Sequence, residues 1–387
     1  MAAAIKAAER KRNVLILEKG ERPGRKILAS GNGRCNLMNS SIPRYYGNRE
    51  FACKILELAN RNELTAFLRH YGLMTTEEED GRIYPSSYQS SSVMTVLRSA
   101  LDLLNVPILT HQTVCSAEKE MDTYIVRCAN GDVFSSSSLV IACGGAAQPK
   151  LGGSEDGYRI LKSMGHSIVS ISPSLVPLTT DSKSISGLSG IRARCSVSLF
   201  HRGRQMHKEK GEILFTDYGV SGICVMQCSR FASEQGSHLE IDFLSDLFPD
   251  EKHAFNEMRR RRDLYYEYSP IVLLEGIVHE KIAFAILKQA GIPMREEKVH
   301  ELKDEDIKRV VQTAYKYKIC ITGNRGFEYA QVTAGGARCE EFYPETLESR
   351  IMPGLYATGE VLDVDGDCGG FNLMFAMASG LIAGKAV

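Results

Sequence analysis

The residues from Gly354 to Gly380 have the types and spacing of a turn that could bind a small molecule. Glu360 follows a short apolar run, and the pair Gly369–Gly370 precedes an apolar segment that begins near Asn372. A carboxylate at a strand end can accept hydrogen bonds from sugar-type hydroxyls, and paired glycines let the backbone approach a flat ring. Free N–H groups at a helix start favour an anion developing on such a ring. The pattern fits one half of a flavin site, and it equally fits an ordinary strand-turn-helix.

A second acidic residue, Glu18, ends the short apolar run 14–17. In a Rossmann βαβ unit a glycine loop opens the first helix, and an acid that binds ribose follows about 20 residues later. Here the helix-favouring segment 1–12 already precedes Glu18, so the first strand and the G-x-G-x-x-G loop would fall before Met1. We therefore expect the natural gene product to start upstream of Met1 and to supply both. The alternative is that Glu18 only terminates an edge strand.

Two further segments contain glycines that could wrap a cofactor. Residues 24–36 are rich in Gly, Arg, Lys and Asn, and residues 139–143 form an apolar run that enters the turn Gly144–Gly145. Such loops present backbone N–H groups and permit positive φ, although the first has a composition that an exposed loop would share. Residues 51–71 have helical periodicity, and Asn130–Gly131 between two apolar runs predicts a β-hairpin.

Five stretches, in order, resemble the HI0933-like family of two-dinucleotide-binding flavoproteins, which includes bile-acid and steroid reductases. They are Glu18–Asn36, Gly81–Ser86, Val140–Gly145, Gly211–Gly222 and Gly354–Gly380. The resemblance implies an α/β fold with a Rossmann-like FAD-binding domain that is interrupted by an inserted antiparallel β-domain and a helical cap. The absent first strand and G-x-G-x-x-G loop are the main departure from the family pattern.

The change in sequence texture beyond residue 173 agrees with this architecture. Residues 185–222 alternate apolar and polar side chains with frequent glycine, whereas residues 270–318 have amphipathic helical spacing. We expect the FAD-binding domain, the inserted β-domain and the cap to comprise residues 1–172 with 330–387, residues 173–250 with 318–329, and residues 251–317, respectively.

The resemblance also implies which residues contact the FAD. They are Glu18, Lys19, Arg25, Lys26, Gly31, Asn32, Asn36, Val114, Ala142, Gly144, Gly359, Glu360, Asp363, Gly370, Asn372 and Leu373. For catalysis we select Tyr84 as proton donor and Arg34 as the group that polarises a substrate carbonyl, because both lie in motifs that the family places near the flavin. The alternatives are that Tyr84 packs in the core and that Arg34 pairs with the cofactor.

The activity implied by the family is that of an FAD-dependent oxidoreductase that uses NAD(P)H, of the EC 1.3.1 type. The implied substrate is a flat apolar ring system, a bile-acid or steroid enone of the 7-dehydroxylation pathway, whose double bond is conjugated to a 3-ketone. No second G-x-G-x-x-G is present, so a nicotinamide donor has no Rossmann domain of its own. The alternatives are a flavin-binding protein without catalysis, acting as a sensor or an RNA-associated partner, and a flavoenzyme acting on an amine or a quinone.

The amino-acid composition argues against several other classes of protein. The 387-residue chain is 43% hydrophobic and has 47 acidic and 47 basic side chains, so no net field attracts nucleic acid or an anionic membrane. We expect a cytoplasmic protein without a membrane segment, and the sequence gives no signal for an oligomeric state. The eleven cysteines include no Cys-x-x-Cys pair, which argues against structural zinc and a disulfide framework. Arg259–Arg262 with Tyr265–Tyr266 could contact nucleic acid, but such a run is more often a solvated helix face, and we expect no nucleic-acid partner.

Overall fold

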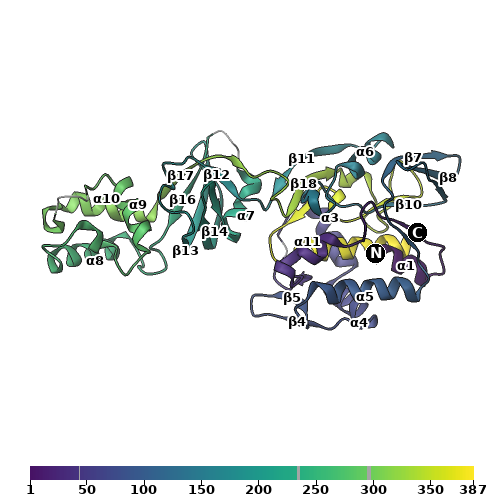
Figure 1. The fold of residues 1–387 in the computed structure, drawn as a ribbon, viewed down its shortest axis with the longest axis horizontal. Helices are drawn as coiled ribbons and strands as arrows, with labels where there is room; N and C mark the ends of the chain where they lie inside the picture. The colour runs from purple at the N-terminus through teal and green to yellow at the C-terminus, as the bar shows by residue number, and fades with distance from the viewer. Residues whose placement is uncertain (43, 233–235, 294–297) are drawn as a thin grey trace. The chain divides into compact units, whose positions relative to one another are not determined.

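The computed structural model describes residues 1–42, 44–232, 236–293 and 298–387. The chain divides into two compact units, which we call unit 1 (Met1–Pro173 with Ala330–Val387) and unit 2 (Ser174–Tyr329). Each unit has its own hydrophobic core. Both ends of the chain belong to unit 1. Figure 1 colours the chain from purple at the N-terminus to yellow at the C-terminus.

Unit 1 combines short parallel strands with small antiparallel sheets and helices. Its helices are α1 (Ala2–Glu9), α2 (Arg25–Ala29), α3 (Arg49–Leu58), α4 (Arg61–His70), α5 (Ser90–Leu103), α6 (Asp156–Ser163) and α11 (Phe371–Ala386). Its strands are β1 (Ile16–Leu17), β2 (Met38–Asn39), β3 (Tyr45–Gly47), β4 (Thr75–Glu77), β5 (Arg82–Pro85), β6 (Ile108–Leu109), β7 (Val114–Glu120), β8 (Thr123–Cys128), β9 (Val133–Ser136), β10 (Leu139–Ile141), β11 (Ile168–Ser174), β18 (Val332–Ala337), β19 (Leu355–Ala357) and β20 (Val364–Gly366).

The parallel pairs in unit 1 are β1 with β6 and β10 with β19. Antiparallel pairing forms the sheets β2-β5-β4, β7-β8-β9 and β20-β3, and β11 pairs with β18. The β8–β9 pair flanks Asn130–Gly131, as expected from the turn sequence. Parallel pairing places β10 and β19 side by side, so the carboxyl ends of these strands lie at one edge.

Helix α11 is the central helix of unit 1 and is apolar on nearly all sides. Its side chains from Phe371 to Gly384 are mostly buried, and it contacts α1, α3 and α4. The contact with α1 is close, because a Cβ added at Gly384 would lie 2.3 Å from the carbonyl oxygen of Ala3. Figure 1 shows α11 in yellow beside α1 in purple. The glycines therefore allow the first and last helices of the chain to pack against each other.

The periodic segment 51–71 is two helices rather than one. Helix α3 ends at Leu58 and α4 begins at Arg61, with Asn60 at the N-cap of α4. The Asn60 side chain accepts hydrogen bonds from the backbone N–H groups of Asn62 and Glu63. A capping asparagine satisfies the first free donors of a new helix, which is the local reason for the break.

Unit 2 is built on a closed barrel with the strand order β12-β15-β14-β13-β16-β17. The strands are β12 (Leu178–Thr180), β13 (Arg192–His201), β14 (Arg204–Phe215), β15 (Gly219–Ser221), β16 (Ser237–Asp242) and β17 (Tyr317–Asn324). Helix α7 (Ile223–Cys228) packs on β14. From Tyr317 to Gly323 in β17 the residues alternate between buried and exposed, as expected for a strand with one face on the core.

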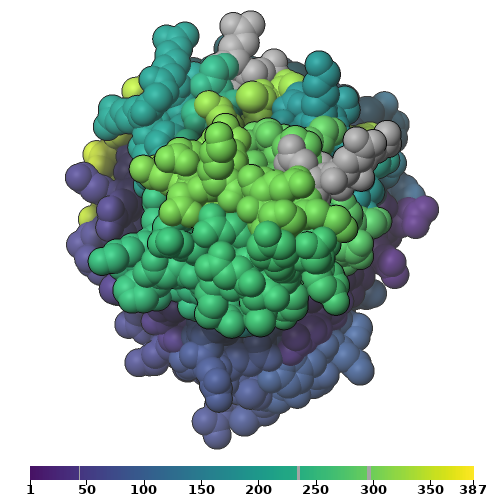
Figure 2. All heavy atoms as spheres, turned by 90° about the vertical axis from the view of Figure 1, so that its left-hand side faces the viewer, coloured from purple at the N-terminus to yellow at the C-terminus, as the bar shows by residue number. Residues whose placement is uncertain are grey.

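Three more helices complete unit 2: α8 (Glu251–Leu264), α9 (Glu280–Gln289) and α10 (Asp304–Tyr315). Helix α10 contacts both α8 and α9, and Figure 2 shows the lighter green of α10 above the darker green of α8. The basic run lies on α8 and is largely paired with acids. Arg260 and Arg261 bond Glu257, and Arg262 bonds Asp304. Much of the positive charge of the run is therefore neutralised within unit 2 itself.

The expected fold class is confirmed: an α/β, Rossmann-like unit is interrupted by an inserted antiparallel barrel. Whether the helices of unit 2 act as a cap stays a prediction. Within the described part of the chain, each helix falls short of the length and apolar character that crossing a bilayer requires. The same residues contain no group of three or more His, Cys, Asp or Glu side chains arranged to hold a metal ion.

Candidate cofactor site

The Glu360 carboxylate connects three segments of unit 1. Its Oε2 lies 2.8 Å from Lys26 Nζ, and its Oε1 accepts a hydrogen bond of 2.8 Å from the backbone N–H of Thr333. Lys26 comes from α2, Thr333 from β18, and Glu360 from the short 3₁₀ turn after β19. Each carboxylate oxygen has a further lone pair, so Glu360 can still accept a bond from a ligand hydroxyl.

Gly145 lies against this carboxylate at the end of β10. A Cβ at Gly145 would be 2.5 Å from Thr333 Oγ1 and 2.6 Å from Glu360 Oε1, which leaves no room for a side chain. Gly144 has a φ of +74° and open space around it, and Ala142 is exposed at the strand end. Gly145 is therefore required by the packing of Thr333 and Glu360, whereas the backbone at Gly144 is open to the close approach of a ligand.

A second glycine contact brings the segment around Asn36 to the start of α11. Gly370 has a φ of +101°, and a Cβ there would lie 2.5 Å from the carbonyl oxygen of Met38 and 2.6 Å from Asn36 Oδ1. The Oδ1 atom of Asn36 is buried and has no hydrogen-bond partner among the described residues. Gly31, with a φ of +56°, lies on the other side of Asn36. A buried acceptor without a partner is costly, so this atom indicates a ligand that donates a hydrogen bond.

The Asn372 side chain orders the loop that precedes α11. Its Oδ1 accepts a hydrogen bond of 2.8 Å from the Gly366 backbone N–H, and its Nδ2 donates one of 2.9 Å to the Gly366 carbonyl. These bonds fix the turn from which the first N–H groups of α11 point, and Leu373 lies half-buried in the same helical turn. Because those N–H groups lack helical partners, this end of α11 favours a nearby anion.

The two residues selected for catalysis, Tyr84 and Arg34, are in contact. Arg34 Cζ lies 4.6 Å from the ring centroid of Tyr84 and 4.5 Å from that of Tyr88. Arg34 also forms an ion pair of 2.7 Å with Glu78, and the Tyr84 side chain is buried. A guanidinium has five N–H donors, so the ion pair leaves donors for a further partner.

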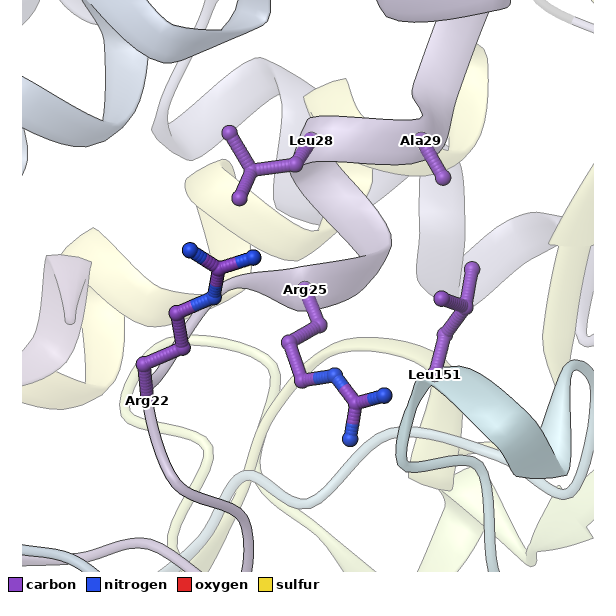
Figure 3. A pocket seen from close by; sticks show the side chains of 5 residues that line it. All are labelled: Arg22, Arg25, Leu28, Ala29 and Leu151. Atoms are coloured by element: carbon purple, nitrogen blue, oxygen red, sulfur yellow. The ribbon is translucent and has the colours of Figure 1, made fainter.

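The polar residues near Glu18 are held by different partners. Glu18 Oε1 accepts a hydrogen bond of 2.7 Å from the Gly20 backbone, and Lys19 forms an ion pair of 2.7 Å with Asp156. Arg25 donates a hydrogen bond of 2.6 Å to the Lys150 carbonyl. Arg25 also lines a cavity of about 290 Å³; the lining residues, drawn in Figure 3, are Arg22, Arg25, Leu28, Ala29 and Leu151. The cavity thus combines two guanidinium groups with apolar side chains.

The remaining predicted contact residues lie at turns and strand ends of unit 1. Val114 opens β7 and pairs with Cys128, and Asn32 is exposed with a φ of +53°. The Gly359 backbone N–H donates to Ser379 Oγ, and the Asp363 backbone N–H donates to the Ala337 carbonyl. These bonds fix the backbone around Glu360 from both sides.

Sequence reasoning missed three polar residues of this region. Thr333 is fully buried within the all-buried strand β18, and Asn39 donates a hydrogen bond of 2.8 Å to the Gly369 carbonyl. Gln112 bonds Asp132 through Nε2, whereas its buried Oε1 has no partner among the described residues. For Thr333 the available signal was a hydroxyl inside the apolar, glycine-rich run 332–337. Nothing in their local sequence marks Asn39 and Gln112.

These residues fit a dinucleotide cofactor. The orphaned oxygens of Asn36 and Gln112 can accept bonds from the N–H or hydroxyl groups of such a ligand. The carboxylates of Glu18 and Glu360 retain acceptor capacity for ribose or ribityl hydroxyls, and the backbone at Gly144 is free of neighbouring atoms. Unit 1 therefore offers acceptors and bare backbone that suit a flavin dinucleotide, whereas the sequence has no G-x-G-x-x-G loop for the pyrophosphate of that cofactor.

The fold and this site define a Rossmann-type FAD-binding protein. Residues 1–386 match the family described as "HI0933-like protein Rossmann domain", and the chain belongs to that family, as expected from its motifs.

Curated relatives match nearly the whole chain, among them the following two. The 3-dehydro-bile acid delta(4,6)-reductase of Clostridium scindens is 35% identical, over 99% of this chain and 95% of the relative. The ribosomal RNA dihydrouridine synthase of Escherichia coli is 29% identical, over 96% of this chain and 91% of the relative. Among solved structures, a 3-ketosteroid-delta4-(5alpha)-dehydrogenase from Rhodococcus jostii RHA1 in complex with 4-androstene-3,17-dione matches with a TM-score of 0.43 and 14% identity. That match covers 100% of this chain and 93% of the other.

Proposed function

We propose that the protein is an FAD-dependent oxidoreductase that uses NAD(P)H to reduce a carbon–carbon double bond conjugated to a 3-ketone in a bile-acid or steroid ring. The observation that carries this proposal is the 35% identity to a bile-acid delta(4,6)-reductase over 99% of the chain. The glycine turns, the Glu360 carboxylate and the orphaned Asn36 oxygen support the cofactor part of the proposal.

The bound FAD, once reduced, would supply the hydride for such a reaction. Lys26, Glu360 and Thr333 would hold the turn after β10 against the cofactor, and the start of α11 would lie near the part of the ring that becomes anionic on reduction. The chain's own contribution is thus to fix the cofactor between segments that are far apart in the sequence.

The substrate needs a donor at its carbonyl oxygen and a proton at its α-carbon. We assign the first role to Arg34 and the second to Tyr84. Their direct contact supports this pairing, since two groups serving one small substrate must lie within a few ångströms of each other. Glu78 would orient Arg34, because its carboxylate already binds one edge of the guanidinium.

A second candidate function is the reduction of a uridine base in ribosomal RNA, which the 29% identity to a dihydrouridine synthase favours. Both reactions add two hydrogens across a ring double bond next to a carbonyl, so one site could serve either. The ion pairs that neutralise much of the α8 basic run weaken this candidate, because phosphate binding depends on available positive charge. We therefore rank it second.

An anaerobic reoxidation assay tests the proposal. The protein is loaded with FAD, reduced with NADPH or NADH, and mixed in a stopped-flow instrument with a 3-keto-Δ4 steroid, a 3-keto-Δ4,6 bile acid, a quinone, an imine, or unmodified ribosomal RNA. We expect the enones to reoxidise the reduced flavin fastest, as measured by the return of the oxidised flavin absorbance. Reoxidation by RNA with formation of dihydrouridine would establish the second candidate. Reoxidation only by the quinone or the imine would refute both.

Donor specificity is measured in the same experiment. Bleaching of the oxidised flavin band by NADPH or NADH is followed before any acceptor is added. A flavin that neither nucleotide reduces, but that dithionite reduces and an enone then reoxidises, would contradict the NAD(P)H assignment and leave the enone reductase intact. A flavin that is inert to every acceptor would indicate a binding protein without catalysis.

A further inference from the structure

One arginine of unit 2, Arg325, lies against two tyrosine rings. Its Cζ atom is 4.1 Å from the ring centroid of Tyr218 and 3.7 Å from that of Tyr329. Tyr218 precedes β15 and Arg325 follows β17, and the barrel order places β12 between these two strands. The contact therefore lies at one end of the barrel and is formed by segments more than a hundred residues apart.

The Arg325 guanidinium has no carboxylate or carbonyl partner among the described residues, although it is half-buried. The arginines of the α8 run differ, since Arg260, Arg261 and Arg262 each bond an acid. Aromatic rings cover the faces of a guanidinium and leave the N–H groups at its edge free to donate. Arg325 is thus a positioned cation whose hydrogen-bonding capacity is not used within the described part of unit 2.

The backbone holds both sides of this contact in place. The Arg325 N–H donates to the Pro177 carbonyl at 3.1 Å, and the Thr180 N–H donates to the Tyr218 carbonyl at 3.2 Å. Asn324 Oδ1 accepts a hydrogen bond of 2.8 Å from the Gly326 N–H, which closes the turn after β17. Because the segments are fixed before any ligand arrives, less conformational entropy is lost on binding.

We propose that Arg325, Tyr218 and Tyr329 form a binding site for the carboxylate of a small molecule. The planar guanidinium fork matches a carboxylate bidentately, and the two phenol hydroxyls can add hydrogen bonds. Two exposed acids, Asp217 and Glu328, directly precede the tyrosines in sequence. Their charge repels any anion, and it repels a polyanion such as RNA more strongly than a ligand with a single carboxylate. The acid group of a bile acid is the carboxylate that fits, and this last step rests on the proposed function.

Equilibrium binding to the full-length, FAD-loaded protein tests the site. Cholate serves as the carboxylate probe, and cholate methyl ester is the matched neutral probe; both are titrated calorimetrically. We expect Arg325→Gln to weaken cholate binding about tenfold or more and to leave ester binding unchanged. Arg325→Lys should recover only part of the affinity, since an ammonium cannot form the planar fork. Arg204→Gln, which removes the same charge from an exposed position of unit 2, should bind both probes as the wild type does.

Three results would overturn the proposal. The first is an equal loss of binding affinity for cholate and for its methyl ester in Arg325→Gln. The second is a lower unfolding temperature of that variant with an unchanged ratio of cholate affinity to ester affinity, which would make the contact purely structural. The third is displacement of cholate by a short single-stranded RNA, which would assign the site to a nucleic acid. Failure of the proposed function is separate: the wild type would then reduce neither the acid nor the ester form of a 3-keto-Δ4 bile acid, whatever Arg325 binds.

Discussion

Lys26 Nζ lies 2.8 Å from Glu360 Oε2, and this ion pair joins residues that are 334 positions apart in the chain. The other oxygen of the same carboxylate binds the backbone of Thr333. The pair therefore ties the glycine-rich segment after β1 to the turn after β19. Glu360 also lies against Gly145 in the turn after β10, and we predict that loss of the Glu360 side chain weakens cofactor binding.

The first prediction concerns the two acids. Glu360→Ala and Glu18→Ala should each weaken FAD binding, because each removes a charged acceptor for a cofactor hydroxyl, worth about 1.5–3 kcal/mol. FAD affinity is measured by equilibrium titration of the apoprotein with fluorescence detection. Glu345→Ala, on the loop before β19, is the control. Lower thermal stability of Glu360→Ala with unchanged FAD affinity would mean that Glu360 only anchors Lys26 and Thr333.

The second prediction concerns Gly370. Gly370→Ala places a methyl group 2.5 Å from the Met38 carbonyl oxygen in a backbone conformation with φ of +101°. We expect a loss of about 1–3 kcal/mol in unfolding free energy and a marked loss of FAD. Gly131→Ala, at φ of +92° in open space, incurs only the backbone strain and should retain FAD. If the two variants behave alike, the close contact around Gly370 does not matter for the cofactor.

The third prediction concerns the reaction. Tyr84→Phe should slow enone turnover by about 10²-fold or more, as loss of a positioned proton donor does, while NAD(P)H still reduces the flavin at the normal rate. The matched control is Tyr88→Phe, since Tyr88 also lies against Arg34. Single-turnover stopped-flow separates the two half-reactions. Equal turnover of Tyr84→Phe and the wild type would mean that Tyr84 only packs in the core and donates no proton.

The fourth prediction concerns pH and a buried histidine of unit 1. His166 bonds Glu341 through Nδ1 and Ser349 through Nε2, and it stacks on Phe342. Burial lowers the pKa of His166 from its ordinary value of 6.5, against the opposing effect of Glu341. The unfolded chain then binds this proton more readily than the folded chain, so unfolding free energy should fall as pH drops below about 6.5, by at most about 1.4 kcal/mol per pH unit.

Urea unfolding at pH 7.5 and 5.5 measures this effect. His166→Gln should lose less stability than the wild type over that interval, and the exposed His253→Gln should behave as the wild type. An identical fall in all three proteins would show that other groups cause the acid sensitivity.

The sequence alone was sufficient for the family and the fold class. Apolar alternation and the Asn130–Gly131 turn are local properties, and they correctly indicated an antiparallel sheet beyond residue 173 and the β8–β9 hairpin. The Rossmann-like unit was implied by the resemblance of five motifs to the family. The same periodicity did not separate α3 from α4, because the break depends on how the Asn60 side chain caps the second helix. The predicted cofactor contacts and catalytic roles remain predictions.

Only the tertiary structure decided which side chains meet. Three contacts join residues that are far apart in the sequence. They are Lys26 with Glu360, Arg34 with Glu78, and Arg325 with Tyr218. From residue type alone we expect a charged side chain to need a partner of opposite charge. Many partners are available, however, along a chain with 47 acidic and 47 basic side chains. The choice among them depends on which strands pair and which glycines let segments approach, and those distances exist only once the chain has folded.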